Sequence, residues 1–130
     1  MKLGKIEAPV RLALAFFQAC NRQAVEDLTA LLSEDCRFES PISPCGEVLR
    51  GRESIGSYWR EFFMAHPGAR FEVQEAFGMG FHSVVRWICL WQDPNSGTHT
   101  LCGMDLFRIA GEVICEQVSF GKSGKATETV

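Results

Sequence analysis

A chain of 130 residues is the size of one domain, and its 46% hydrophobic and 22% charged residues are typical of a soluble globular protein. Its net charge of −3 argues against a nucleic-acid-binding surface, which needs clustered positive charge. The longest apolar run, at 12–17, is far shorter than the ~20 residues of a membrane span. We therefore expect neither nucleic acid nor membrane as a partner. Because no secretory signal is recognised at the N-terminus, we expect a cytoplasmic protein.

The first half of the chain shows the apolar spacing of three and four residues that is typical of helices. It predicts a helix over 6–20, a short helix around 25–32, a brief strand at 36–40, a loop at 41–51 and a third helix at 52–66. The loop is predicted from its prolines and glycines. The third helix is expected to end at His66, because the Pro67 that follows cannot continue a helix.

The second half changes to the alternating pattern of strands. Strands are predicted at about 70–78, 81–92, 98–109 and 112–120, followed by a flexible polar tail over 122–130. Ala110-Gly111 is predicted to form the last tight turn, since glycine accepts the positive φ that such turns need. Helices followed by an antiparallel meander indicate an α+β architecture.

Three short segments carry a resemblance to a known superfamily. They are Phe38-Glu39-Ser40-Pro41, Leu49-Arg50-Gly51-Arg52-Glu53-Ser54-Ile55 and Asp105-Leu106-Phe107-Arg108-Ile109. In this order and spacing they resemble the nuclear transport factor 2-like superfamily, and within it the ketosteroid isomerase and SnoaL-like polyketide cyclase branch. The resemblance implies a single SnoaL-like domain over 1–121. Its fold, also called cystatin-like, has three N-terminal helices and a curved antiparallel sheet that form a cone.

The resemblance also implies a pocket inside the cone. Aromatic residues are concentrated on the elements that line such a pocket, which favours a small apolar molecule as the ligand. We expect the pocket to be lined by Phe16, Cys20, Phe38, Ser40, Tyr58, Trp59, Phe62, Trp87, Phe107 and Glu116.

The resemblance identifies one candidate catalytic residue. Ketosteroid isomerases use a carboxylate base at the end of the first strand, together with a tyrosine and a protonated aspartic acid that stabilise an enolate. The base position here is Ser40, which is too weak a base, and the tyrosine position is Phe16, which has no donor. Only the aspartic acid is present, as Asp105. Steroid-type double-bond migration is therefore not expected, and Asp105 is predicted to be catalytic in another proton transfer, a cyclisation or a hydration.

The direction in which Asp105 points is open in the sequence. If it faces the pocket, burial raises the pKa of its carboxyl group, which then donates a hydrogen bond or acts as a general acid. The alternative is a side chain that faces outward or pairs with Arg86 or Arg108.

Glu116 presents a second open choice. In one register it shares an inward face with Ile114 and Val118 and is a second buried carboxyl beside Asp105. In the other register Glu116 lies at the surface, and Gln117 and Ser119 face the cavity instead. The length of the preceding turn decides between the two, because a one-residue slip exchanges the faces of a strand.

The cysteines and histidines indicate no metal or cofactor site. No two of the six cysteines form a CxxC pair, and no histidine lies at ligand spacing from a cysteine. We expect the thiols to pack as small apolar side chains. No cofactor and no metal are expected.

Three classes of function remain open. The first is a cofactor-independent enzyme that acts on an apolar cyclic or polyketide-like substrate through Asp105. The second is a binding protein that holds an apolar ligand without chemistry. The third is a dimeric accessory protein. The apolar character of both faces of the strand around 84–91 suits this third class. A homodimer through the sheet is expected in each case, because the resemblance implies it: members of the superfamily commonly pack sheet to sheet.

Overall fold

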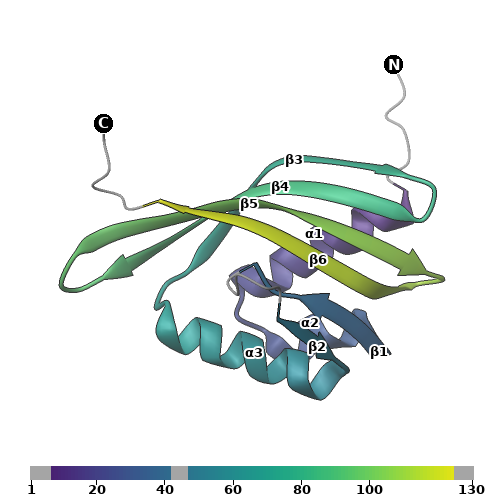
Figure 1. The fold of residues 1–130 in the computed structure, drawn as a ribbon, viewed down its shortest axis with the longest axis horizontal. Coiled ribbons are helices and arrows are strands. Elements are labelled where there is room, and N and C mark those ends of the chain that lie inside the picture. Colours follow the sequence, from purple (N-terminus) through teal and green to yellow (C-terminus); the bar gives the residue numbers. More distant parts are fainter. Residues whose placement is uncertain (1–6, 42–46, 125–130) are drawn as a thin grey trace.

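The elements of the fold follow the predicted order. The computed structural model describes residues 7–41 and 47–124. It contains α1 (Ala8–Asn21), α2 (Val25–Ala30), β1 (Leu32–Glu39), β2 (Val48–Arg50), α3 (Arg52–Ala65), β3 (Arg70–Met79), β4 (His82–Asp93), β5 (Gly97–Ala110) and β6 (Val113–Gly124). No helix within these ranges is long and apolar enough to cross a membrane. Figure 1 shows the long strands β3–β6 as an upper layer, with α1 packed beneath them and α3 farther below. The predicted α+β class is confirmed.

A proline and a glycine mark the starts of α1 and α3. Pro9 lies in the first turn of α1, where its missing N–H has no partner to lose. Before α3, Gly51 has a φ of 91°, a conformation that other residues rarely adopt. The apolar residues of α3 recur every three or four positions, so Ile55, Trp59 and Phe62 are buried on one face.

One sheet contains all six strands, in the order β2-β1-β6-β5-β4-β3. The predicted sheet was antiparallel throughout, and this is wrong for one pair: β1 lies parallel to β6. A parallel pair requires a long crossover connection, and here α3 and four strands separate the two partners in the chain. Register shifts between Val73 and Glu75 and between Arg108 and Ile109 interrupt the ladders. Such bulges bend strands, which accounts for the curl of the sheet.

Three predicted boundaries are wrong. β1 begins at Leu32 instead of 36, and the predicted loop at 41–51 contains the short strand β2. The strand β6 continues to Gly124, where its backbone pairs with Thr100 of β5, so residues 122–124 belong to this strand and not to the predicted tail. Pairing with a neighbouring strand, which a local pattern does not report, extends β1 and β6. Residues 125–130 of the predicted tail lie outside the described residues.

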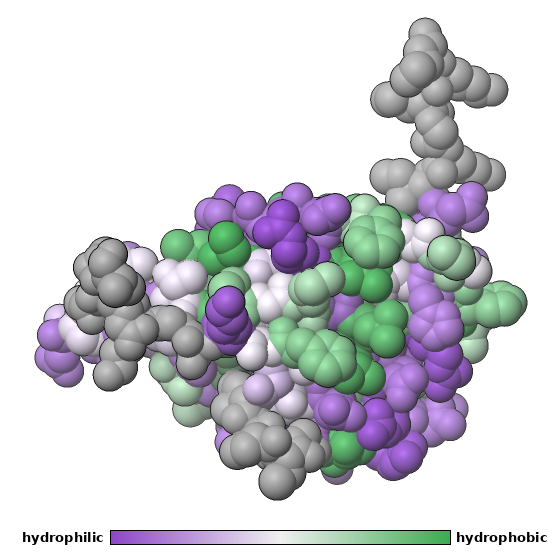
Figure 2. Space-filling view, turned by 45° about the horizontal axis from the view of Figure 1, so that its top comes forward, coloured by the Kyte–Doolittle hydropathy of each residue, from purple (hydrophilic) through white to green (hydrophobic). Residues whose placement is uncertain are grey.

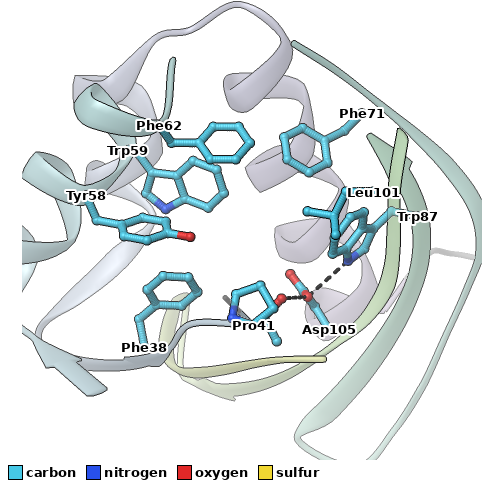
Figure 3. Close-up of a pocket in the computed structure, with 10 residues that line it drawn as sticks. Phe38, Pro41, Tyr58, Trp59, Phe62, Phe71, Trp87, Leu101 and Asp105 are labelled. Carbon is cyan, nitrogen blue, oxygen red and sulfur yellow. Dashed lines mark hydrogen bonds between the residues drawn. The ribbon is translucent and has the colours of Figure 1, made fainter. Parts of the chain in front are cut away.

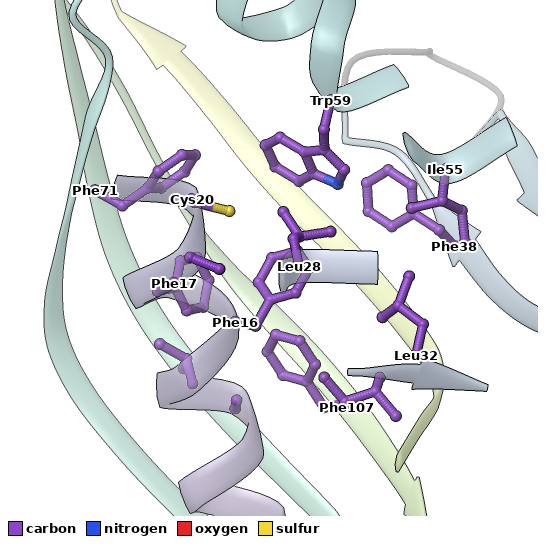
Figure 4. Packing of buried hydrophobic residues seen from close by; sticks show 14 of the residues in the cluster. Phe16, Phe17, Cys20, Leu28, Leu32, Phe38, Ile55, Trp59, Phe71 and Phe107 are labelled. Carbon is purple, nitrogen blue, oxygen red and sulfur yellow. The ribbon is translucent and has the colours of Figure 1, made fainter. Parts of the chain in front are cut away.

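The core lies between the sheet and the three helices (Figure 4). Phe16 of α1 is fully buried at its centre, with its ring centroid 5.6 Å from that of Trp59 and 5.7 Å from that of Phe107. Edge-to-face contacts of this kind stabilise aromatic clusters. Aromatic side chains therefore join α1, α3 and the sheet into one unit.

The outer face of the sheet carries an apolar row. Phe77, Val84, Leu106 and Val118 are successive partners across four strands, so their side chains share that face. Figure 2 shows apolar residues gathered on this face with polar residues around them. Phe77 is 54% exposed and Leu106 is 38% exposed.

Candidate functional site

Asp105 faces the interior of the cone. Side chains alternate along β5, so Asp105 shares the inward face with Phe107 and Ile109, and it is only 3% exposed. The outward alternative is wrong. Arg86 pairs with Glu75 on the outer face, and Arg108 pairs with Glu116.

Three donors bind the Asp105 carboxyl group. The indole Nε1 of Trp87 lies 3.0 Å from Oδ1, and the hydroxyl of Ser119 donates to the same oxygen. The amide Nε2 of Gln117 donates to Oδ2 at 2.7 Å. Gln117 and Ser119 are two residues apart on β6, so both point inward beside β5. Neighbouring strands thus supply every donor.

Burial is the dominant electrostatic effect at this carboxyl. Desolvation raises the pKa of Asp105 to about 6, while hydrogen bonds from Ser119, Gln117 and Trp87 stabilise the charged form and limit the rise. A carboxyl with this pKa is mostly ionised at neutral pH. It is therefore poised as a general base, whereas the sequence favoured a donor or general acid.

One position on the carboxyl remains for a ligand. A carboxylate offers about four acceptor sites, two on each oxygen. Oδ1 of Asp105 accepts from both Trp87 and Ser119, whereas Oδ2 accepts only from Gln117 among the described residues. In Figure 3 the oxygen without dashed bonds points toward the aromatic rings on the far side. Oδ2 is therefore the atom that can take a proton.

That oxygen borders a small apolar cavity. The free space measures about 20 Å³, room for very few water molecules and far below the ~300–1,000 Å³ of typical ligand pockets. Side chains from helix and sheet enclose it: Phe38, Pro41, Tyr58, Trp59, Phe62, Phe71, Trp87, Leu101, Asp105 and Ser119. A molecule larger than water enters only if some of these side chains move.

The helix side of the cavity holds an unsatisfied donor. Among the described residues, the indole nitrogen of Trp59 is the one buried side-chain nitrogen or oxygen without a hydrogen-bond partner. A buried donor left unpaired costs about 1–3 kcal/mol. Beside it, the hydroxyl of Tyr58 accepts a hydrogen bond from Ser40 at 3.3 Å. Burial raises the pKa of Tyr58, so its hydroxyl stays protonated at neutral pH.

Tyr58 and Phe62 lie between this cavity and the surface. Both also line an open groove along α3, together with Glu47, Leu49, Ser54, Ser57, Glu61, Ala65 and His66. Their rings stack with centroids 6.5 Å apart. Tyr58 and Phe62 are the described residues that line both the cavity and that groove.

The predicted pocket residues divide into two groups. Phe38, Tyr58, Trp59, Phe62, Trp87 and Asp105 line the cavity. Phe16, Cys20 and Phe107 do not, because they are fully buried in the core beneath it. Ser40 is buried and does not line the cavity, but its hydroxyl donates a hydrogen bond to the hydroxyl of Tyr58, which does.

The placement of Glu116 in the pocket is wrong. Its carboxylate forms ion pairs with Arg37 at 3.1 Å and Arg108 at 3.3 Å on the outer face. The register shift between Arg108 and Ile109 sets this facing, so that Gln117 and Ser119 point inward. The second alternative that the sequence left open for this strand is the observed one.

Sequence reasoning missed three lining residues and one role. Phe71 and Leu101 lie on the inward faces of β3 and β5, and strand alternation was the signal that would have found them. Pro41 was assigned to a loop, and no local pattern shows that its ring reaches the cavity. Trp87 was expected as apolar lining, whereas its indole also donates to Asp105.

The described cysteines are free thiols with packing roles. Cys20, Cys36 and Cys89 are buried, and burial raises the pKa of each thiol, to about 12 for Cys36 and Cys89. These side chains are therefore un-ionised and poor nucleophiles at neutral pH. Cys45 lies outside the described residues. In the described part of the chain, no cluster of His, Cys, Asp and Glu has the geometry of a metal site.

Comparison with known proteins confirms the predicted superfamily. The SnoaL-like domain model matches residues 13–117. A nuclear transport factor 2-like protein of unknown function from Mesorhizobium loti has 20% identity and a TM-score of 0.72, over 94% of this chain and 99% of that one. No protein of curated function matches the sequence.

Two Mycobacterium tuberculosis structures also share the fold. An LEH-like epoxide hydrolase has 13% identity and a TM-score of 0.74, over 88% of this chain and 83% of that one. A protein in complex with estradiol-17β-hemisuccinate has 14% identity and a TM-score of 0.76, over 88% and 94% of the two chains. At these identities the likeness concerns the fold.

Proposed function

We propose that this chain, which belongs to the SnoaL-like domain family, binds a small, mostly apolar molecule beside Asp105 and uses that carboxylate to move a proton on it. The observation that carries the proposal is the arrangement of Oδ2. It belongs to a buried carboxyl with a pKa of about 6, has one acceptor site left, and borders an apolar cavity.

The proposed reaction begins with ionised Asp105. Oδ2 takes a proton from a carbon next to a polar group of the ligand, or from a water that adds to the ligand. The resulting carboxylic acid returns a proton at a second position and regenerates the carboxylate. Trp87, Gln117 and Ser119 hold the carboxyl in one orientation throughout. This series of proton transfers needs no redox step. Isomerisation, cyclisation and hydration are all compatible with it.

Ligand entry requires side-chain movement, because about 20 Å³ is too small for an organic molecule. Tyr58 and Phe62 are the proposed gate, since both border the groove outside as well as the cavity. Rotation of these rings joins the two spaces. The fold likeness to an epoxide hydrolase and to a protein with a bound steroid ester supports the size and apolar character of the proposed ligand.

A non-catalytic ligand holder is the second candidate. The tight hydrogen bonding of Asp105 favours it, because a carboxyl held by three donors also serves as a structural element of the core. The two candidates differ in whether product forms.

The experiment compares wild type with Asp105→Asn on two probes. A cyclic β,γ-unsaturated ketone reports isomerisation through the absorbance of its conjugated product, and a cyclohexene epoxide reports hydration through the diol. We expect turnover of one probe by wild type and a loss of at least about 100-fold in Asp105→Asn. Binding of the probes without turnover would favour the ligand holder. Turnover that survives in a folded Asp105→Asn protein would overturn the role of Asp105.

A further inference from the structure

The cavity has a donor side and an acceptor side. Asp105 and its three donors occupy the sheet side. The helix side carries the indole N–H of Trp59 and the hydroxyl of Tyr58, both from α3. In Figure 3 the Trp59 nitrogen lies at the ring edge that faces the Tyr58 hydroxyl and Phe38. Two protonated donors thus border the space opposite one carboxylate.

We propose that Trp59 Nε1 and the Tyr58 hydroxyl bind an oxygen atom of the ligand, and that the ligand is therefore a small apolar ketone or a related carbonyl compound. This inference rests on the proposed function, since it places the ligand in the same cavity. In this arrangement the two α3 side chains bind the carbonyl oxygen, and Asp105 faces the hydrogens on the carbon next to the carbonyl group.

The Trp59 donor carries this inference. Its side chain is 95% buried, and its N–H has no partner among the described residues. The contrast with Trp87 is direct, because the N–H of Trp87 is satisfied by Asp105. A core tryptophan usually finds an acceptor when it is buried. A donor that is left unpaired at the border of a cavity is matched by an acceptor that arrives with the ligand.

Tyr58 adds the second donor. Its oxygen accepts from Ser40, so the phenol proton remains for donation to a ligand. Two donors on one oxygen stabilise the negative charge that develops there when a base removes the adjacent proton. The same pair thus has a role in binding and in proton transfer.

The matched probes are cyclohexanone and methylidenecyclohexane, which have the same ring but differ in C=O against C=CH₂. Binding is followed by NMR of the indole N–H signals in protein labelled with ¹⁵N-tryptophan. We expect cyclohexanone to bind about tenfold more tightly than the hydrocarbon and to move the Trp59 signal downfield. Trp59→Phe should reduce the ratio of the two affinities, leaving only the part that the Tyr58 hydroxyl contributes, whereas Trp91→Phe, which removes an indole outside the cavity, should leave the ratio unchanged.

A second variant separates the loss of the N–H group from the loss of ring volume. Benzothienylalanine at position 59 alone keeps the bicyclic ring but has sulfur in place of the N–H. It should reduce the preference for the ketone as far as Trp59→Phe does, while retaining the unfolding temperature of wild type. Equal binding of both probes to wild type, with an unmoved Trp59 signal, would overturn the inference and assign the N–H to the faces of neighbouring rings.

The outcomes separate the two proposals. Binding of neither probe would count against the apolar ligand site itself. Binding of the ketone with no exchange of its α-hydrogens in D₂O would support the oxygen site and count against proton transfer. With both proposals correct, wild type exchanges these hydrogens, and Asp105→Asn binds the ketone without exchanging them.

Discussion

The indole of Trp87 donates a hydrogen bond to the carboxyl of Asp105 across two neighbouring strands, at 3.0 Å and out of contact with bulk water. This bond joins a buried tryptophan of β4 to the one buried carboxyl among the described residues. Since Trp87 helps to stabilise the charged form of Asp105, the aromatic wall and the titration of the carboxyl are linked.

The rate of proton transfer should depend on the ionisation of Asp105. Because the pKa of this carboxyl is raised to about 6 and the base form is the active one, kcat/KM should increase with pH through about 6 and then remain level. A pH–rate profile on the responding probe measures this. A rate that instead falls above pH 6 would identify Asp105 as the acid.

Stability should show the opposite dependence on pH. The pKa of Asp105 is about 6 in the folded protein and about 3.9 in an unfolded chain, so the unfolded state loses its proton first. The free energy of unfolding should therefore decrease by about 2 kcal/mol between pH 4 and pH 6 from this group. Urea unfolding of wild type and Asp105→Asn across this range isolates the contribution. Parallel curves for the two proteins would contradict it.

Gly103 should be irreplaceable beside Trp87. A Cβ atom at this position would collide with the carbonyl oxygen of Phe120 and lie 2.9 Å from the Trp87 ring. We expect Gly103→Ala to lower the free energy of unfolding by about 1–3 kcal/mol. Gly56→Ala in α3 is the matched control, because its nearest neighbour is a side-chain methyl at 3.3 Å and alanine favours helices. If both changes lowered the free energy of unfolding equally, this would show that β5 moves to accommodate the added methyl group.

Removal of the Phe62 ring should open the cavity toward the groove. Phe62→Ala is expected to accelerate binding of an uncharged apolar probe, N-phenyl-1-naphthylamine, as measured by stopped-flow fluorescence. Phe63→Ala is the control, because Phe63 is buried to a similar extent but does not line the cavity. Both changes should cost about 3–5 kcal/mol of stability. Equal binding rates in the two variants would remove Phe62 from the entry path.

The outer apolar row should be the contact of a homodimer. Its members face outward in register, and Phe77 and Leu106 are among the exposed large apolar residues. We expect light scattering at micromolar concentration to give a dimer, and Leu106→Glu to give a folded monomer. Gln18→Glu, at an exposed position on α1, should not change the mass. A wild-type monomer would contradict this expectation.

Local pattern was sufficient for much of the molecule. Apolar spacing in Arg52–Ala65 predicts α3 and its buried face, and alternation along Gly97–Ala110 together with the family resemblance places Asp105 on the inward side. These features depend on residues close together in the chain. For that reason the α+β class and the candidate carboxyl were predictable.

Tertiary structure decided what depends on strand register and on chain segments that meet from a distance. The shift between Arg108 and Ile109 turned Glu116 outward and brought Gln117 and Ser119 to Asp105. The parallel pairing of β1 with β6 also involves distant segments. So does the packing of aromatic rings that leaves a cavity of only about 20 Å³. A sequence fixes the period of each strand, but the relative offset of two strands is set by packing of the whole core, which no local pattern encodes.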